Sequence, residues 1–223
     1  MHIFNDGSVS ISCGAVEMGQ GVRVKLCNIA AHIFSIDSAR IKLESTNTTR
    51  IANMSPTSAS TGTDLNGQAI RIACEQIMQR LKQLAANILS VDSALISINN
   101  ERVCIAEQAS DLDWKMLISQ AYMARCALSA QAHYATPHLS FDMQTEKGGP
   151  FAYHVYGCAA IEVTIDCLRG RYQLDSIKII HDIGQSLAPE IDRGQIEGAV
   201  VQGLGWMTME EIRYDETGSL LSD

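Results

Sequence analysis

The stretch GAVEMGQGVRVKLCNIAAHIF, residues Gly14–Phe34, decides the fold because it joins a glycine-rich turn directly to an amphipathic segment. The second part of this stretch carries apolar residues at helical spacing: Val22, Leu26, Ile29, Ala30 and Ile33. That spacing predicts a helix with one apolar face. Before the turn, HIF and SVSIS flank Asn5-Asp6-Gly7, and Asp-Gly is a strong hairpin signal. After the helix, IKLES (41–45) predicts a short strand.

The rest of the chain continues this mixture of hairpins and helices. A long loop rich in Ser, Thr and Asn (46–63) leads to a helix that Thr63 or Asp64 could cap and that runs to about Leu89. The remaining predictions are a hairpin at 95–106, a helix at 113–124, a long hairpin around 169–170, a helix at 189–209 and a final hairpin at 211–223. We therefore expect an α+β fold of mixed sheets with packed helices, with possible subdomains 1–90 and 91–223.

Composition narrows the class of protein. Of the 223 residues, 46% are hydrophobic and 19% are charged, as in ordinary globular domains. The net charge of −8 disfavours nucleic acid as a partner. No apolar run reaches the roughly 18 to 20 residues that a bilayer span needs, and the first residues lack the features of a secretory signal. We expect a cytoplasmic protein without a membrane partner.

The cysteines and histidines do not form a metal-binding pattern. The seven cysteines are widely spread and contain no C-x-x-C pair, which argues against a disulfide framework, a zinc ribbon or an iron–sulfur cluster in this chain. Several lie in apolar stretches, as Cys74 and Cys158 do, where a thiol packs as a small hydrophobe. The six histidines lack metal-ligand spacing, so we expect structural roles for them.

Three segments are rich in glycine, hydroxyl and amide side chains and poor in charge: GAVEMGQG (14–21), MSPTSASTGTDLNGQA (54–69) and DRGQIEGAVVQGLG (192–205). Glycine lets a backbone approach a ligand closely, and the N–H groups at a helix start bind anions. Together the segments suit a phosphorylated heterocycle. Each segment alone is more simply explained as a turn, a helix end or close helix packing, and none is a G-x-G-x-x-G or a phosphate-binding P-loop.

The strings EMGQG, SPTSAS followed by TDLNGQA, and GQIEGAVVQGLG resemble the molybdenum-cofactor-binding region of the xanthine dehydrogenase and aldehyde oxidase family, and within it the xanthine dehydrogenases most. In that family the dithiolene sulfurs of a pterin hold molybdenum, so the resemblance implies no metal-ligating side chain here. It implies a pterin contact for the Gln20 amide, with Gly19 and Gly21 beside it, and for the Gln195 amide. It places the backbone of Ala59 near the open face of the metal, with Ser60 continuing that contact. It also implies that Thr61, Gly62 and Thr63 wrap the pterin phosphate, with Gly62 standing where relatives often have Ser.

The family reaction hydroxylates a carbon of a purine or an aldehyde with oxygen from water, and a glutamate acts as general base. The glutamate string, which resembles KAVGEPP in relatives, is absent, so we expect that residue beyond residue 223 and the substrate-facing residues before Met1. FAD and iron–sulfur clusters would lie on other segments or subunits. We expect the isolated chain to be inactive and to hold the cofactor weakly or not at all. The alternative is a non-catalytic cofactor-binding or assembly module of a redox complex.

Two acidic residues inside the three segments, Glu17 and Glu197, are interpreted as structural. For each we expect a buried carboxylate satisfied by backbone donors rather than a catalytic group. Asp64 is interpreted as a helix cap and not as a phosphate neighbour, because two anions would repel each other.

Overall fold

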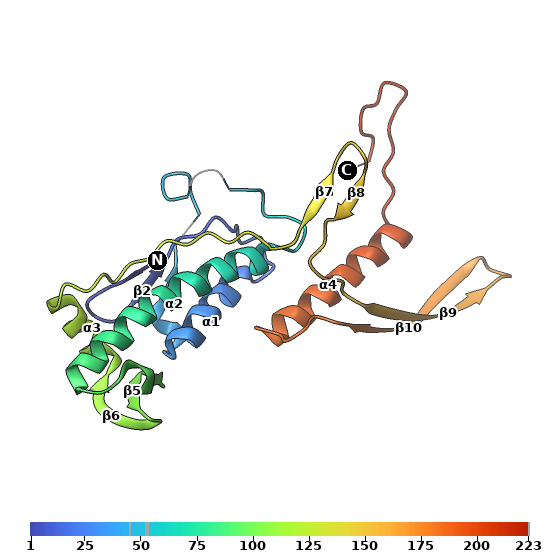
Figure 1. Cartoon of the computed structure of the whole chain (residues 1–223). Coiled ribbons are helices and arrows are strands. Elements are labelled where there is room, and N and C mark those ends of the chain that lie inside the picture. The colour runs from blue at the N-terminus through green and yellow to red at the C-terminus, as the bar shows by residue number, and fades with distance from the viewer. Residues whose placement is uncertain (45, 52–53, 223) are drawn as a thin grey trace. The chain divides into compact units, whose positions relative to one another are not determined.

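The computed structural model describes residues 1–44, 46–51 and 54–222, which form two compact units. The first unit contains Met1–Ala135 together with Glu197–Asp223, and the second contains Thr136–Ile196. Helices and small mixed sheets alternate along the chain, which confirms the α+β prediction (Figure 1). Four residues lie outside the described part of the chain: 45 of the predicted strand, 52 and 53 of the predicted long loop, and 223 of the predicted final hairpin.

The first sheet is built around the stretch that decides the fold. Its strands β1 (His2–Ile3), β2 (Val9–Ile11) and β3 (Ile41–Leu43) lie in that order, with β1 antiparallel and β3 parallel to β2. A parallel pair needs a crossover, and α1 (Val22–Phe34) supplies it. The predicted hairpin, helix and strand are therefore confirmed as a β-hairpin followed by a β–α–β unit.

The long helix α2 (Gly62–Leu89) packs beside α1, and both helices begin at the same end (Figure 1). A Cβ placed at Gly62 would lie 3.6 Å from Val22 Cγ2, so the two first turns touch. One turn and a half further along, a Cβ at the buried Gly67 would lie 2.7 Å from Ile29 Cδ1. The absence of a side chain at Gly67 thus sets how closely the two helices approach.

A second sheet closes the first unit. Strands β4 (Ile96–Asn99), β5 (Arg102–Ile105) and β6 (Gln108–Asp113) form an antiparallel meander, and α3 (Trp114–Met123) follows directly. The fully buried Trp114 lies at the centre of the shared core, with its ring 5.6 Å from that of Phe34. Its indole Nε1 donates a 2.8 Å hydrogen bond to the Gly7 carbonyl, so α3 is joined to the β1–β2 hairpin.

A short sequence motif occurs twice in this unit and was not predicted. SIDSARI (35–41) follows α1, and SVDSALI (90–96) follows α2. In both copies the first serine ends its helix in the left-handed conformation, with φ of 53° at Ser35 and 54° at Ser90. An aspartate two residues later then caps a 3₁₀ turn that leads into a strand, by accepting a 2.9 Å bond from the backbone N–H two residues further on.

The second unit consists mainly of hairpins. Strands β7 (Ser140–Asp142) and β8 (Lys147–Gly149) form a short hairpin, and β9 (Gly157–Asp166) and β10 (Arg171–His181) form a long one. The long hairpin and the helix α4 (Pro189–Thr208) were predicted, whereas β6, β7 and β8 were not. The first part of α4, up to Ile196, belongs to this unit, and the remainder belongs to the first unit.

Some predictions from the sequence were wrong. The helix α2 begins at Gly62 with Thr61 as its N-cap, so Thr63 and Asp64 lie inside the first turn instead of at the cap position. By contrast, the predicted final hairpin is present in a short form: Tyr214 and Leu220 form an antiparallel bridge, and the Leu221 N–H donates to the Arg213 carbonyl at 2.8 Å.

The cysteines divide into three groups by burial, and three of them, Cys13, Cys27 and Cys126, are partly buried. Cys74 and Cys104 are buried, and burial raises the pKa of the Cys74 thiol to about 12, so it packs as a neutral hydrophobe. Cys158 and Cys167 are exposed; Cys158 lies in β9, where nearly every residue is exposed, and Cys167 directly follows that strand. The interpretation of Cys158 as a core residue is therefore wrong. No helix among the described residues has the length and apolar character needed to cross a bilayer.

Candidate functional site

The turn Gly14–Gly21 is organised around a single carboxylate. Glu17 Oε1 accepts hydrogen bonds from the backbone N–H groups of Gly19 at 3.0 Å and Gly21 at 2.9 Å, and its Oε2 accepts from Arg23 at 2.9 Å. Gly19 and Gly21 have φ of 98° and 74°, a region that side chains other than glycine rarely adopt. The turn therefore needs both glycines, and Glu17 satisfies the donors that they expose.

The charge of Glu17 is stabilised by these contacts. Partial burial raises the pKa of the Glu17 carboxyl, but the bonds from Arg23, Gly21 and Gly19 together outweigh it, so the pKa is lowered overall. The prediction of backbone donors is confirmed, whereas the predicted burial is wrong because Glu17 is an exposed residue. Hydrogen bonding rather than burial fixes this carboxylate.

The Gln20 side chain is held at both ends within the same turn. Its Oε1 accepts a 2.6 Å bond from the Met18 N–H, and its Nε2 donates a 2.8 Å bond to the Val16 carbonyl. An amide nitrogen carries two hydrogens, and Val16 uses one of them. The side chain is half-buried and fixed in direction, with a second N–H that has no partner among the described residues.

The second segment combines strained backbone with an open helix start. Ala59 and Ser60 both have left-handed backbones, with φ of 57° and 56°, which is costly for residues with a side chain. Thr61 returns to the right-handed region at φ −95° and makes no side-chain cap to α2. Within the described part of the chain, the N–H groups of Gly62 and Thr63 have no acceptor. Such a sequence of conformations before a helix is typical of a concave anion site.

Two contacts bring the first two segments together, and a third attaches the start of the loop that precedes the second segment to the first. The Val16 N–H donates to Thr57 Oγ1 at 3.0 Å, and Thr46 Oγ1 donates to the Ala15 carbonyl at 3.1 Å. Met54 crosses Gly14 so closely that a Cβ there would lie 1.8 Å from the methionine sulfur. These contacts were not predicted from the sequence, although Thr57 lies within the SPTSAS string.

The third segment lies on α4. Gln195 is an exposed residue of the second unit, and Glu197 begins the part of α4 that belongs to the first unit. The roles of Gln195 as a pterin contact and of Glu197 as a structural acid stay predictions. Among the described residues no group of three or more His, Cys, Asp or Glu side chains is placed to hold a metal ion.

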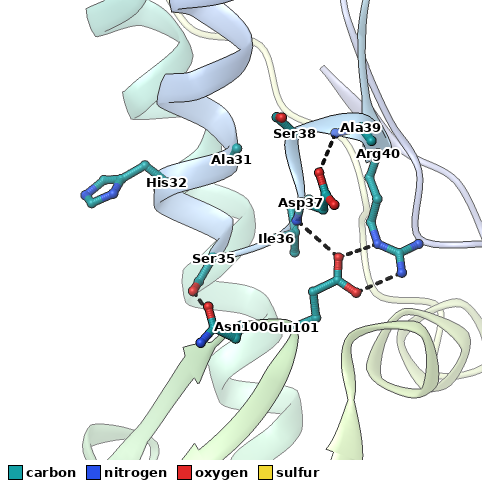
Figure 2. A pocket seen from close by; sticks show the side chains of 10 residues that line it. All are labelled: Ala31, His32, Ser35, Ile36, Asp37, Ser38, Ala39, Arg40, Asn100 and Glu101. Atoms are coloured by element: carbon teal, nitrogen blue, oxygen red, sulfur yellow. Dashed lines mark hydrogen bonds and ion pairs between the residues drawn. The ribbon is translucent and has the colours of Figure 1, made fainter. Parts of the chain in front are cut away.

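A pocket lies at the opposite end of α1 from the Gly14–Gly21 turn, with a volume of about 850 Å³ (Figure 2). Its lining contains residues 31, 32, 35–40, 100 and 101. The Arg40 guanidinium donates to both oxygens of Glu101, from Nε at 2.6 Å and from Nη2 at 2.8 Å. Glu101 also accepts from the Asp37 N–H at 3.1 Å. An α1 of 13 residues separates the pocket from the turn by about 20 Å, so the two do not form one site.

The residues that line the pocket connect the β4–β5 turn to the segment that follows α1, which explains the pocket structurally. The Glu101 N–H donates to the Ser35 carbonyl at 2.8 Å, and the Asn100 N–H donates to Ser35 Oγ at 3.0 Å. The β4–β5 turn is thereby attached to the linker that follows α1. Since the Arg40 and Glu101 charges are already paired, the pocket is not the site that the three segments predict.

Uncharged donors, strained backbone and an open helix start are features suited to one class of protein, a domain that binds an anionic organic cofactor. Comparison with known proteins identifies that class. Residues 1–223 match the family described as "Molybdopterin cofactor-binding domain", and the chain belongs to this family.

Individual relatives agree with this assignment. The chain is 39% identical over 220 residues to xanthine dehydrogenase/oxidase of Mus musculus and 37% identical over 229 residues to xanthine dehydrogenase 1 of Arabidopsis thaliana. These matches cover 99% and 100% of the chain and 15% of each relative, so the chain spans about one seventh of their length. The resemblance to xanthine dehydrogenases seen in the three strings is confirmed.

Solved structures share the fold. The CO dehydrogenase of Oligotropha carboxidovorans superposes with a TM-score of 0.83, and quinoline 2-oxidoreductase of Pseudomonas putida 86 with 0.81. Each is 23% identical and covers 99% of this chain, while the chain covers 26% and 28% of them, respectively. At this identity the likeness concerns the fold alone.

Proposed function

We propose that residues 1–223 form one side of the molybdopterin site of a molybdenum hydroxylase, a xanthine dehydrogenase-like oxidoreductase. Membership of the molybdopterin-binding family supports this function. The observation that carries it is the open start of α2, where strained Ala59 and Ser60 precede N–H groups without acceptors in the described part of the chain, beside a fixed Gln20 amide. Strained backbone conformations of this kind cluster at ligand-binding sites, where they are part of how the ligand is bound.

The donor set fits a phosphorylated pterin that brings its own metal ligands. Thr61, Gly62 and Thr63 would wrap the phosphate. The backbone N–H groups of Gly62 and Thr63 would donate to it, and the positive end of the α2 dipole adds to their attraction, whereas the Thr61 N–H already donates to the Ser58 carbonyl. The second N–H of the Gln20 amide would donate to the metal-bearing side of the pterin, with Gly19 and Gly21 allowing close approach. Ala59 and Ser60 would face the metal, and Gln195 would add a further amide contact.

When bound, the cofactor supplies the redox chemistry for placing oxygen from water on a carbon of a purine or an aldehyde. The residues of this chain bind and orient it. The Glu17 carboxylate is poorly suited to act as a base, because it is engaged by three backbone donors. We therefore assign no proton transfer to Glu17. FAD and iron–sulfur clusters on other parts of the enzyme would receive the electrons, in the cytoplasm.

The phosphate position can be tested by adding a competing charge. Gly62→Asp places a carboxylate at the start of α2, where a new Cβ would meet only Val22 Cγ2 at 3.6 Å, an ordinary contact distance. The acidic residue should favour the helix, since it faces the positive end of the dipole. It should nevertheless repel the phosphate, so we expect molybdenum and released pterin to fall about tenfold or more, a loss of roughly 1.4 kcal/mol of binding free energy.

Gly62→Asn is the matched neutral control and should keep most of the cofactor. Molybdenum would be measured by elemental analysis and pterin by fluorescence after release, in the protein at its natural full length. Equal molybdenum in Gly62→Asp and wild type would refute the phosphate position. A wild type without molybdopterin would favour the assembly module and refute the proposed function.

A further inference from the structure

The Glu17 carboxylate joins the Gln20 turn to α1. Gln20 makes its two side-chain bonds to Met18 and Val16, which belong to the same turn. Those bonds fix the amide relative to the turn but do not fix the turn relative to the helix. The bond from the Arg23 N–H to Glu17 Oε2 does so, because Arg23 lies in the first turn of α1.

Glu17 also restricts the backbone conformations of the two glycines that flank Gln20. Glycine has more conformational freedom to lose on ordering than any other residue. Here a single oxygen, Glu17 Oε1, accepts hydrogen bonds from the N–H groups of both Gly19 and Gly21. The backbone on each side of Gln20 is therefore fixed by the same carboxylate oxygen. Bonds from N–H groups to an ionised carboxylate are roughly twice as strong as neutral ones.

The same carboxylate distinguishes the two helix starts that lie side by side. Each helix N-terminus carries a partial positive charge and unpaired N–H groups, so two neighbouring starts offer an anion two places to bind. At α1 the N-cap residue Gly21 has no side chain, and Glu17 takes the Arg23 N–H instead. At α2 the N-cap residue Thr61 makes no side-chain cap. Of these two described starts, that of α2 remains open for a phosphate.

On the basis of the proposed function, we propose that Glu17 is the positioning residue of the cofactor site. It directs the Gln20 amide toward the pterin and, by occupying the start of α1, leaves the start of α2 as the place for the cofactor phosphate. Glu17 itself touches neither cofactor nor substrate. The carboxylate is ionised throughout the neutral range, so this role does not change with pH there.

The test uses Glu17→Gln in the protein at its natural full length. Replacing one carboxylate oxygen by an NH₂ group puts a donor against a backbone donor. Because Glu17 is an exposed residue outside the core, we expect the effect to stay local and the chain to fold. We expect amide hydrogen exchange at residues 19–23 to become about tenfold faster or more. We also expect a changed Mo(V) paramagnetic resonance signal and kcat lowered by about 10- to 100-fold with KM unchanged, as when a residue that orients a metal-site contact is lost.

Two further variants sharpen the result. Glu17→Asp keeps the charge on a shorter side chain and should recover part of the exchange protection and of kcat. Asp6→Asn is the matched control, because Asp6 also accepts a backbone N–H within a turn, that of Ser8 at 2.9 Å, but in the β1–β2 hairpin. It should leave the molybdenum signal and exchange at residues 19–23 as in wild type.

The outcomes separate the two proposals. Wild-type exchange in Glu17→Gln would overturn the role of Glu17, and so would faster exchange with an unchanged molybdenum signal and kcat, since Glu17 would then be merely structural. A wild type that holds no molybdopterin would refute the proposed function instead, and the positioning role with it. Faster exchange, an altered signal and a normal Asp6→Asn control would support the positioning role.

Discussion

Replacing Gly67 with Ala tests how α1 and α2 are held together, and thus how their N-termini come to lie side by side. The new Cβ would lie 2.7 Å from Ile29 Cδ1, and 3.9 Å from both Leu26 Cδ2 and Thr63 Cγ2. A real Cβ does not tolerate the first distance, whereas the other two are ordinary contacts. The clash is therefore confined to one methyl group at the end of a side chain.

The expected magnitude follows from two opposing terms. Alanine in a helix interior is about 1 kcal/mol more favourable than glycine. Overpacking a close interface costs about 1–3 kcal/mol. We expect Gly67→Ala to lower the free energy of unfolding by about 1 kcal/mol, the difference between these terms. Ile29→Val alone should lower it by about 0.5–1.5 kcal/mol, because it removes the Cδ1 methyl of a half-buried residue.

The double variant gives the decisive comparison. In the Ile29→Val background the clashing methyl is gone, so Gly67→Ala should retain its helix-propensity gain and become stabilising. Urea unfolding of the 223-residue chain, followed by circular dichroism, would measure all four proteins. A coupling of about 1–2 kcal/mol is expected, within the range for residues in contact. Additive effects within about 0.5 kcal/mol, the usual result for independent sites, would show that Gly67 does not set the helix spacing.

Three further predictions concern the core and the Arg40–Glu101 pair. Trp114→Phe removes the donor to the Gly7 carbonyl and leaves a void at a fully buried position, so urea unfolding should show a loss of about 2–4 kcal/mol. Arg40→Lys replaces the two-point contact with Glu101 by a single charge. Because the side chains of Arg40 and Glu101 are both about a quarter exposed, the same assay should show a loss of at most about 1 kcal/mol in the free energy of unfolding. The hydrogen bond from Arg40 lowers the pKa of Glu101, so its stabilisation is present above the unfolded value of about 4.3 and is lost as pH falls through the lower folded value. Melting temperatures measured between about pH 6 and 3 should therefore fall less steeply for Glu101→Gln than for wild type.

Much of the fold could be predicted because its elements follow local patterns. The helical spacing from Val22 onward predicts α1, and the end of α2 at Leu89 agrees with the prediction. Asp-Gly and Arg169-Gly170 mark two hairpins that the structure contains. In each case a few neighbouring residues determine the conformation, so no knowledge of distant contacts is needed.

The start of α2 shows where local patterns fail. Thr63 and Asp64 are good capping residues, yet the helix begins at Gly62 and its N-cap residue makes no side-chain cap. The preceding Ala59 and Ser60 adopt left-handed backbones that no propensity favours for these residues. Long-range contacts attach this loop to the turn Gly14–Gly21: Thr57 contacts Val16, and Met54 contacts Gly14. Pairings of that kind cannot be read from neighbouring residues.

The two helix starts explain why EMGQG and TSASTGT differ so much in composition. The first carries an acid that satisfies its own backbone donors, and it can therefore present the Gln20 amide in one direction. The second contains hydroxyls but no acid before Asp64, and in the described part of the chain it leaves donors at Gly62 and Thr63 for an outside anion. Under the proposed function, an acid that accepted from the Gly62 and Thr63 N–H groups would compete with the phosphate, and an α1 start without Glu17 would offer the phosphate a second place to bind. Under the proposed function, the placement of Glu17 determines which loop orients the cofactor and which loop binds its charge.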